Sequence, residues 1–177
     1  MQGGGGALVV FAGTGNTIIT GAAGPSEFVV GAGAATVSAA SGNIVWAAGA
    51  GNESLIASGG DVILWAANST GNDVLQAGNG PCTLQGGIGN DTILGGTGNA
   101  TMGGGGGADI FEFTNGLGGA SNVIEGFVPG ADTISLNGFS SYSSALVNGS
   151  EVITLSDGTH IELSGISSMS GVAITYG

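Results

Sequence analysis

Lysine and arginine are absent from this chain of 177 residues, whereas aspartate and glutamate together number 12, for a formal net charge of −12. Proteins bind nucleic acids with cationic side chains that displace counterions, so this composition excludes that class of partner. Binding to an anionic membrane surface is excluded for the same reason. A compact chain that carries only negative charge repels itself, and we therefore expect it to bind cations.

Cysteine and long apolar runs are equally scarce. Cys82 is the single cysteine, so no disulfide can form within the chain. Cysteine content therefore does not indicate whether the protein works in an oxidising or a reducing compartment. No segment approaches the ~18 to 20 apolar residues of a membrane span. The N-terminus, Met1-Gln2 and four glycines, lacks the positive region of a classical signal peptide. The chain is expected to be either cytoplasmic or exported by a route that leaves its N-terminus intact.

Residues suited to catalysis are few. His160 is the single histidine, and no lysine or arginine is present to stabilise an oxyanion or a phosphoryl group. A solvated histidine beside the Asp157-Gly158 turn fits His160 better than a Ser-His-Asp arrangement does. Trp46 and Trp65 are interpreted as core or face residues rather than as a platform for sugars. The sequence therefore predicts no enzyme.

Glycine is what the chain has in excess, with 40 residues against a usual share of about 7%. The glycines do not recur at every third residue, which excludes collagen. A hydrophobic fraction of 42% and a mean hydropathy of +0.43 argue against disorder. Short apolar runs at residues 8–11, 18–19, 28–30 and 62–65 alternate with glycine clusters. This alternation predicts an all-β fold of many short strands and tight turns.

A frame of nine residues runs unbroken from 68 to 112. Its five copies read NSTGNDVLQ, AGNGPCTLQ, GGIGNDTIL, GGTGNATMG and GGGGADIFE. The fourth position is always glycine, and the eighth is always apolar, as the set Leu75, Leu84, Ile93, Met102 and Phe111 shows. Five copies in register make this repeat a strong signal.

The frame resembles the RTX nonapeptide GGxGxDxUx, in which U is apolar, of the calcium-binding parallel β-roll family. The resemblance implies that six residues form a turn, three form a strand, and two nonapeptides complete one coil. Residues 18 positions apart then stack, so Asp73, Asp91 and Asp109 would line one edge, and Cys82 and Ala100 the other.

Calcium takes six to eight oxygen ligands, which two stacked turns can supply from carboxylates and backbone carbonyls. The expected calcium edge comprises Asp73, Asp91 and Asp109 with the turn glycines Gly71, Gly87, Gly89, Gly105 and Gly107, and Glu53 and Asp132 extend it. At least two calcium ions are predicted along this edge, and none between Cys82 and Ala100. The alternative is that these aspartates only solvate turns, which would leave their stacked charges uncompensated. Cys82 is interpreted as a small residue that is tolerated in a turn that binds no metal, rather than as a partner in an intermolecular disulfide.

The pattern continues less regularly outside the frame. A polar or small residue precedes an apolar strand at Asn16, Glu27, Ala35, Asn43, Glu53, Asp61, Asn122 and Asp132. We therefore expect one continuous β-solenoid, with degenerate coils over 1–67, the calcium β-roll over 68–135 and a C-terminal β-hairpin cap over 136–177. The hairpin is predicted around Asp157-Gly158. The resemblance implies that the cap also holds an uncleaved signal for type I secretion.

The favoured function is a secreted, calcium-binding structural protein that self-assembles head to tail into a fibre, surface layer or matrix. Residues 68–112 should be disordered without calcium, and lysine or proline at Val9 or Val10 should block assembly at an open strand edge. One alternative is a secretion and folding module of a larger exported protein. Another is an ice-binding solenoid, although the row Thr70, Ile88, Gly106 is broken and Thr83 with Thr101 makes a small patch.

Overall fold

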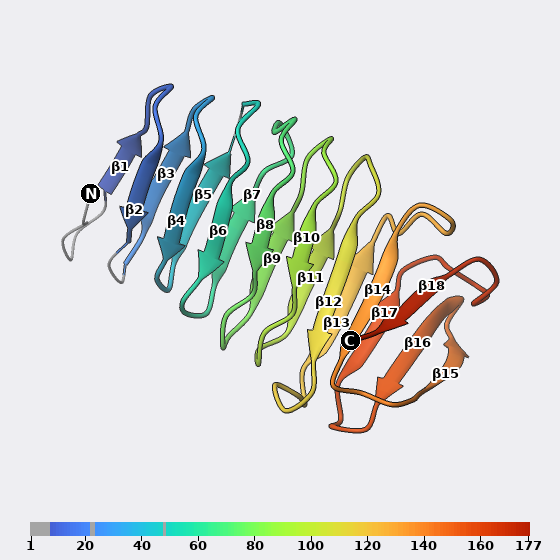
Figure 1. The fold of residues 1–177 in the computed structure, drawn as a ribbon. Coiled ribbons are helices and arrows are strands. Elements are labelled where there is room, and N and C mark those ends of the chain that lie inside the picture. Colours follow the sequence, from blue (N-terminus) through green and yellow to red (C-terminus); the bar gives the residue numbers. More distant parts are fainter. Residues whose placement is uncertain (1–7, 22–23, 48) are drawn as a thin grey trace.

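The computed structural model describes residues 8–21, 24–47 and 49–177 of the chain, and these residues form β-strands joined by turns, without a helix. The chain winds as a β-solenoid in which successive strands alternate between two sheets (Figure 1). The predicted all-β solenoid is therefore confirmed. Since the described residues form no helix, they also provide no helical segment that could cross a membrane.

The first sheet has ten strands, which contact one another in the order β1-β3-β5-β7-β9-β11-β13-β17-β16-β15. Its bounds are β1 Leu8–Phe11, β3 Ser26–Val30, β5 Asn43–Ala47, β7 Val62–Trp65, β9 Cys82–Gln85, β11 Ala100–Gly103, β13 Ser121–Glu125, β15 Tyr142–Val147, β16 Ser150–Leu155 and β17 His160–Leu163.

The second sheet has eight strands in the order β18-β14-β12-β10-β8-β6-β4-β2. Its bounds are β2 Thr17–Thr20, β4 Ala35–Ala39, β6 Ser54–Ala57, β8 Val74–Gln76, β10 Thr92–Leu94, β12 Ile110–Thr114, β14 Thr133–Asn137 and β18 Ala173–Tyr176. Every pair in this sheet is parallel, because each coil returns the chain to the same sheet in the same direction.

Two columns of apolar side chains fill the space between the sheets. Strand pairing aligns one inward residue per coil in each sheet, namely Ile19, Val37, Leu55, Leu75, Ile93, Phe111 and Ile134 in the second sheet and Val10, Phe28, Val45, Leu64, Leu84, Met102, Ile124 and Leu163 in the first. All of them are buried. The eighth position of the nine-residue frame therefore always points into the core, alternately from one sheet and from the other.

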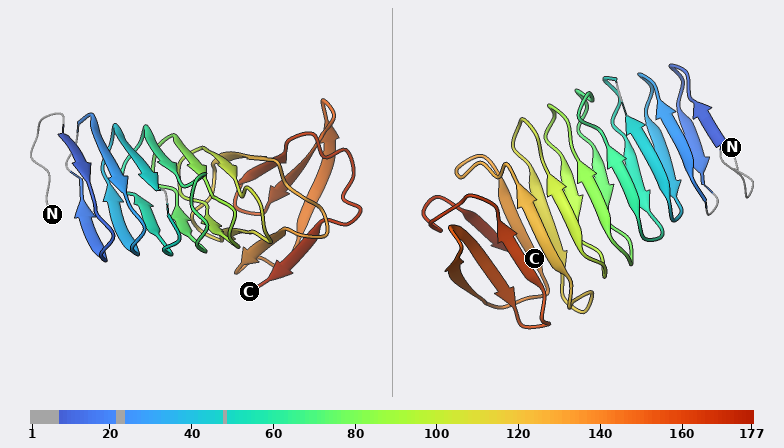
Figure 2. Two further views of the ribbon diagram at one scale, coloured as in Figure 1. Left: turned by 90° about the horizontal axis from the view of Figure 1, so that it is seen from above. Right: turned by 180° about the vertical axis from the view of Figure 1, so that it is seen from behind.

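The C-terminal strands extend both sheets at the end of the stack opposite to β1 (Figure 2). β17 pairs in parallel with β13, and β18 pairs in parallel with β14. β16 and β17 form the antiparallel hairpin predicted around Asp157-Gly158. A second antiparallel pair, β15 with β16, turns at Asn148, whose positive φ of 51° suits asparagine. The strand register thus continues from the coils into the C-terminal region.

Candidate metal centre

Five acidic residues lie in one column along one edge of the solenoid, each directly before a strand of the second sheet. They are Glu53, Asp73, Asp91, Asp109 and Asp132, which precede β6, β8, β10, β12 and β14. Strand pairing places them in five consecutive coils. Each is at most 3% exposed. Five carboxyl groups are therefore buried in a row, in a protein without any lysine or arginine.

Hydrogen bonds connect each member of this column to the next. The backbone N–H of Glu53 donates to Oδ1 of Asp73 at 2.8 Å, and that of Asp73 donates to Oδ1 of Asp91 at 2.8 Å. Asp91 and Asp109 continue the series at 2.8 and 3.1 Å toward Asp109 and Asp132. We call this row, from Glu53 to Asp132, the carboxylate ladder.

Several carboxylate oxygens of the ladder are buried without a hydrogen-bond partner among the described residues. Oδ2 of Asp73, Oδ2 of Asp109 and Oε1 of Glu53 belong to this group. The second oxygens of Asp91 and Asp132 accept backbone N–H groups of Gly87 and Val128 at 2.7 and 2.8 Å. A buried acceptor without a donor is costly, so the unpartnered oxygens are available to a cation.

Burial also changes the acidity of the ladder. Desolvation by burial, together with the neighbouring Asp73 carboxylate, raises the pKa of Glu53 to about 8. Burial likewise raises the pKa of Asp91 to about 6, and the pKa of Asp109 to about 6 with a contribution from the adjacent Asp132 and Asp91 charges. Without a cation, Glu53, Asp91 and Asp109 therefore retain protons at a pH where exposed carboxyl groups have lost them.

Glycine provides the space in which the turns stack. A Cβ at Gly89 would collide with the carbonyl oxygen of Gly71, and one at Gly71 with that of Gly51. Gly87 meets the carbonyl of Ser69 in the same way. Gly105 and Gly107 adopt positive φ angles of 105° and 127°, which side chains rarely tolerate. The turn glycines predicted at the metal edge are thus packed against the backbone of the preceding coil.

Other glycines face the carboxylates themselves. A side chain at Gly86 would collide with the carboxylate of Asp91 and the carbonyl oxygen of Gly104, and one at Gly104 with the carboxylate of Asp109. These bare positions put carboxylate and carbonyl oxygens close together. Sequence reasoning did not assign a ligand environment to Gly86 and Gly104, although both are the first glycine of their nonapeptides.

A second row reinforces the ladder from outside. Oδ1 of Asn52 accepts the backbone N–H of Asn72 at 3.0 Å, and Oδ1 of Asn72 accepts that of Asn90 at 2.8 Å. Asn90 in turn accepts the N–H of Ala108 at 2.9 Å. At the upstream end of the ladder, the Ser69 hydroxyl donates to Oε2 of Glu53 at 3.0 Å. The Asn row and Ser69 are supporting residues that sequence reasoning missed, although the recurrent Gly-Asn pair marks the row.

Among the residues that the structure describes, the equivalent column of the opposite edge contains no acidic residue. Pairing of β7, β9, β11 and β13 aligns Val62, Cys82, Ala100 and Asn122 there. The thiol of Cys82 donates to the carbonyl of Gly80 at 3.1 Å. Cys82 and Ala100 thus stack as predicted, in a column that offers no carboxylate.

The polar or small residues that precede apolar strands outside the nine-residue frame lie partly in these columns. Ala35, Glu53 and Asp132 align with the ladder, and Asn43 and Asn122 with the opposite column. Asn16 is one position away from the ladder column, where Thr17 lies instead. Glu27 and Asp61 are one position away from the opposite column, where Ser26 and Val62 lie. The sequence markers at these three residues were therefore off by one.

The ladder suits calcium better than it suits a metal ion that is coordinated by side chains alone. Within the described residues, no three carboxylate, imidazole or thiol groups converge on one point. Calcium accepts mixed shells of carboxylate and carbonyl oxygens, and the ladder combines both kinds with unpartnered acceptors at Asp73 and Asp109. The residues present are therefore compatible with calcium held between neighbouring coils.

Comparison with protein families supports the same conclusion. The model of the RTX calcium-binding nonapeptide repeat matches the chain in four copies, over residues 48–69, 68–102 and 83–111. Residues 48–111 are RTX repeats. The match includes the ladder from Glu53 to Asp109, and the RTX repeat is a calcium-binding repeat without catalytic groups of its own. A comparison with curated proteins finds no significant match.

Proposed function

We propose that the chain is an exported structural solenoid that folds around calcium along the carboxylate ladder and then associates with further copies of itself. The observation that carries the calcium part is the row of five buried carboxyl groups, each at most 3% exposed, in a chain without a basic residue. A row of buried like charges is unstable unless it is protonated or bound to cations.

In the proposed calcium-bound state, Asp73, Asp91 and Asp109 hold the metal together with carbonyl oxygens of the RTX turns. Glu53 and Asp132 extend the ladder by one coil in each direction, because the backbone N–H of Glu53 and the carboxylate of Asp132 make the same hydrogen bonds that join the central members. Calcium supplies positive charge and accepts the oxygens that lack a donor. The chain's own residues provide the alignment, through the stacked turns and the Asn row.

Self-association is supported by the end of the solenoid that begins with β1 and β2. Among the described residues, β1 pairs only with β3 and β2 only with β4. Val9, Phe11 and Ile18 are 55, 76 and 71% exposed there, and no acidic residue precedes Glu27. Such an edge, apolar and free of charge, is suited to pairing with another strand.

A folding and secretion module of a larger exported protein is the second candidate. It is favoured by the C-terminal region, where β17 and β18 continue both sheets and β15 and β16 extend the first sheet further. Strands that close the array would let calcium-driven folding begin at this end. The two candidates share the calcium ladder and differ in whether the folded chain polymerises.

Calcium titration of the purified, metal-free chain tests the common part of the proposal. We expect circular dichroism to report a gain of β structure with calcium, and a smaller gain with magnesium, which keeps its own water ligands. Light scattering after size-exclusion chromatography, together with electron microscopy, tests the assembly. Ordered polymers in millimolar calcium support the structural protein, whereas a calcium-loaded monomer supports the module. Full β structure at pH 8 without any divalent cation would contradict both.

Val9→Lys is the variant that separates assembly from folding. Val9 points outward, so a lysine there places charge at the open edge while the core remains intact. Val10, which the sequence also suggested, is 6% exposed and packs inward, so its substitution would test folding instead. The matched control is Val74→Lys in β8, an outward valine that is 42% exposed and lies away from the ends.

A further inference from the structure

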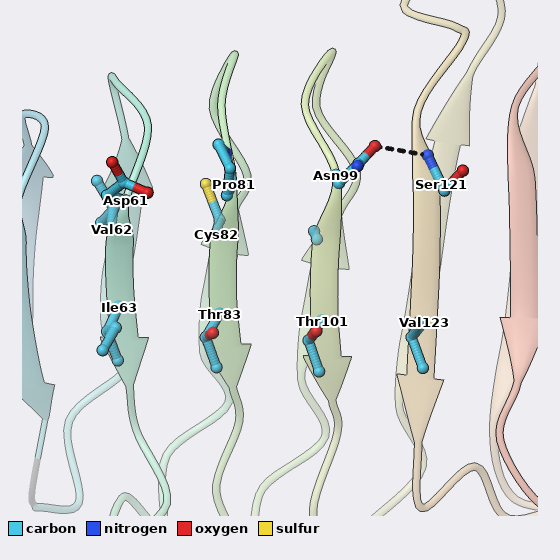
Figure 3. Close-up of a pocket in the computed structure, with 11 residues that line it drawn as sticks. Asp61, Val62, Ile63, Pro81, Cys82, Thr83, Asn99, Thr101, Ser121 and Val123 are labelled. Carbon is cyan, nitrogen blue, oxygen red and sulfur yellow. Dashed lines mark hydrogen bonds between the residues drawn. The ribbon is translucent and has the colours of Figure 1, made fainter.

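A groove of about 530 Å³ runs along the edge opposite to the carboxylate ladder. It crosses four neighbouring strands of the first sheet, β7, β9, β11 and β13, at the points where they begin (Figure 3). One wall is the row Asp61, Pro81, Asn99 and Ser121 at the starts of the strands, and the other is the row of outward strand residues Ile63, Thr83, Thr101 and Val123. The long axis of the groove therefore follows the axis of the solenoid.

The residues between the two walls point into the core and form the floor of the groove. Val62, Cys82 and Ala100 lie between the two rows, and all three are at least 94% buried, at 1, 6 and 4% exposure. On the ladder edge, the equivalent column holds carboxylate side chains instead.

Polar groups with free hydrogen-bonding capacity line this groove. Among the described residues, the hydroxyls of Thr83, Thr101 and Ser121 and the carboxylate of Asp61 make no hydrogen bond. Asn99 uses Oδ1 to accept the N–H of Ser121 at 2.8 Å, which leaves its two amide hydrogens available. Methyl and apolar groups of Thr83, Thr101, Ile63 and Val123 alternate with these polar atoms. Polar and apolar groups therefore alternate along the surface of the groove.

Asp61 adds a second unusual feature at one end of the groove. Its φ of 55° is one of the two positive values among the described non-glycine residues. Aspartate tolerates this conformation better than most residues, yet it still carries a conformational cost. The turn therefore presents an exposed carboxylate at the groove entrance, where it makes no hydrogen bond to the described residues.

Backbone and charge limit what the groove can bind. The backbone groups of β9 are used by pairing with β7 and β11, so an extended peptide cannot add here as a further strand. A chain with a net charge of −12 and no basic residue repels polyanions, including nucleic acids and acidic polysaccharides. What remains is a linear ligand that combines hydroxyl groups with apolar C–H surfaces and carries no negative charge.

We propose that this groove binds a linear, uncharged polysaccharide that lies along the solenoid axis. Neighbouring coils repeat every ~4.7 to 4.9 Å, a spacing similar to the advance of one sugar unit in an extended glycan. The coils of β9, β11 and β13 then each offer a hydroxyl or amide and a methyl group to successive sugar units, and the coil of β7 offers the Asp61 carboxylate and Ile63. Thr83 and Thr101, in register on adjacent strands, form the centre of the site. Sites of this size with a few placed polar groups are typical of ligand binding.

Titration of the ¹⁵N-labelled, calcium-loaded chain with neutral hexasaccharides tests the proposal. Cellohexaose, chitohexaose and maltohexaose are the probes, and an oligogalacturonate of equal length is the acidic comparison. We expect at least one neutral probe to shift the amide signals of residues 61–63, 81–83, 99–101 and 121–123, with the acidic oligomer binding more weakly. No shift with any neutral probe at millimolar concentration would overturn the proposal. So would tighter binding of the acidic oligomer.

Two sets of variants locate the site. Thr83→Val and Thr101→Val keep the shape and remove one hydroxyl each, and each should weaken binding by about twofold to tenfold, as expected for one hydrogen bond. Thr83→Trp should fill the groove and abolish binding. Thr92→Trp is the matched control, because Thr92 is the outward residue at the equivalent nonapeptide position on the other sheet. Binding that survives Thr83→Trp but is lost with Thr92→Trp would place the site elsewhere and refute this assignment.

Discussion

The backbone N–H of Asp73 donates a hydrogen bond of 2.8 Å to the carboxylate of Asp91, one coil further along the solenoid. The same relationship joins Asp91 to Asp109. Each aspartate of the ladder thus aligns its neighbour through the backbone while offering its own carboxylate to the previous coil. The position of each aspartate carboxylate therefore depends on the coil that precedes it, which couples the stacking of coils to metal binding.

This coupling makes Asp91, in the middle of the ladder, the most informative residue to change. Asp91→Asn preserves the shape of the side chain, but its amide has one acceptor for the two N–H groups of Asp73 and Gly87 that the carboxylate now accepts. A hydrogen bond to a charged group is worth about 1.5 to 3 kcal/mol. We therefore expect calcium affinity, measured by isothermal titration calorimetry, to fall roughly tenfold to a hundredfold.

Asp61→Asn is the matched control for that experiment. Asp61 is exposed and lies on the opposite edge, so removal of its charge should leave calcium affinity within about a factor of two. Equal losses in Asp91→Asn and Asp61→Asn would mean that overall negative charge, rather than the ladder, attracts calcium.

Gly89 tests the stacking of the turns separately from their charge. In Gly89→Ala, the new methyl group would meet the carbonyl oxygen of Gly71, and the coils would have to separate. Overpacking of this kind costs about 1 to 3 kcal/mol. Gly106→Ala, in the adjacent turn, would meet nothing within 4 Å and is the control. Urea unfolding in saturating calcium measures both variants, and a Gly89→Ala protein as stable as Gly106→Ala would refute the close stacking.

The fixed period of 68–112 explains why the sequence predicts the centre of the ladder well. Asp73, Asp91 and Asp109 are separated by 18 residues, and their stacking follows from two nonapeptides per coil. Glu53 and Asp132 join the same column at separations of 20 and 23 residues. Those coils hold longer turns, which a fixed period cannot describe. Both residues were nevertheless assigned to the metal edge, because an acidic residue precedes an apolar strand in each case.

The parts that the sequence could not place lack such a period. Upstream of residue 48, polar residues occur both in the turn and in the outward strand positions, so a polar residue before an apolar run does not fix the register. Glu27, for example, is the second residue of β3. β15 is exposed along its whole length and β18 follows a long irregular segment, so neither shows the alternation that identifies a half-buried strand.

The raised pKa values of the ladder predict an unusual pH dependence of the metal-free chain. Burial raises the pKa of Glu53 from 4.5 to about 8, and those of Asp91 and Asp109 from 3.8 to about 6. The folded chain therefore binds more protons than the unfolded chain between about pH 4 and pH 8, and its free energy of unfolding decreases as the pH rises through this window. Urea unfolding at pH 5 and pH 8, after removal of divalent cations, should show greater stability at pH 5.

Calcium should reverse this trend, since it binds the deprotonated carboxylates and competes with protons. In saturating calcium, the free energy of unfolding should increase from pH 5 to pH 8. A metal-free chain whose stability is constant or increases over the same interval would show that the ladder is solvated rather than buried in solution.

The opposite edge offers the most direct test of whether column position alone determines metal binding. Cys82 and Ala100 occupy the column equivalent to the ladder and lie in register on adjacent strands. Both are buried, so the double variant Cys82→Asp/Ala100→Asp would place two carboxyl groups in an apolar environment, flanked by Asn122 in the next coil. Without calcium, two such charges should destabilise the fold by several kcal/mol.

With calcium, the double variant should recover, because the flanking turns carry glycines at the same nonapeptide positions as the ladder edge, such as Gly80 and Gly98. We expect calorimetry to count at least one more calcium ion per chain than in the unsubstituted protein. Cys82→Asn/Ala100→Asn is the control, since it introduces polar groups of equal size without charge and should add no ion. If the aspartate variant is destabilised and calcium neither binds in excess nor restores the fold, the turns of the two edges differ in more than their acidic residues. The carbonyl groups of the ladder turns would then be as specific for calcium as the carboxylates.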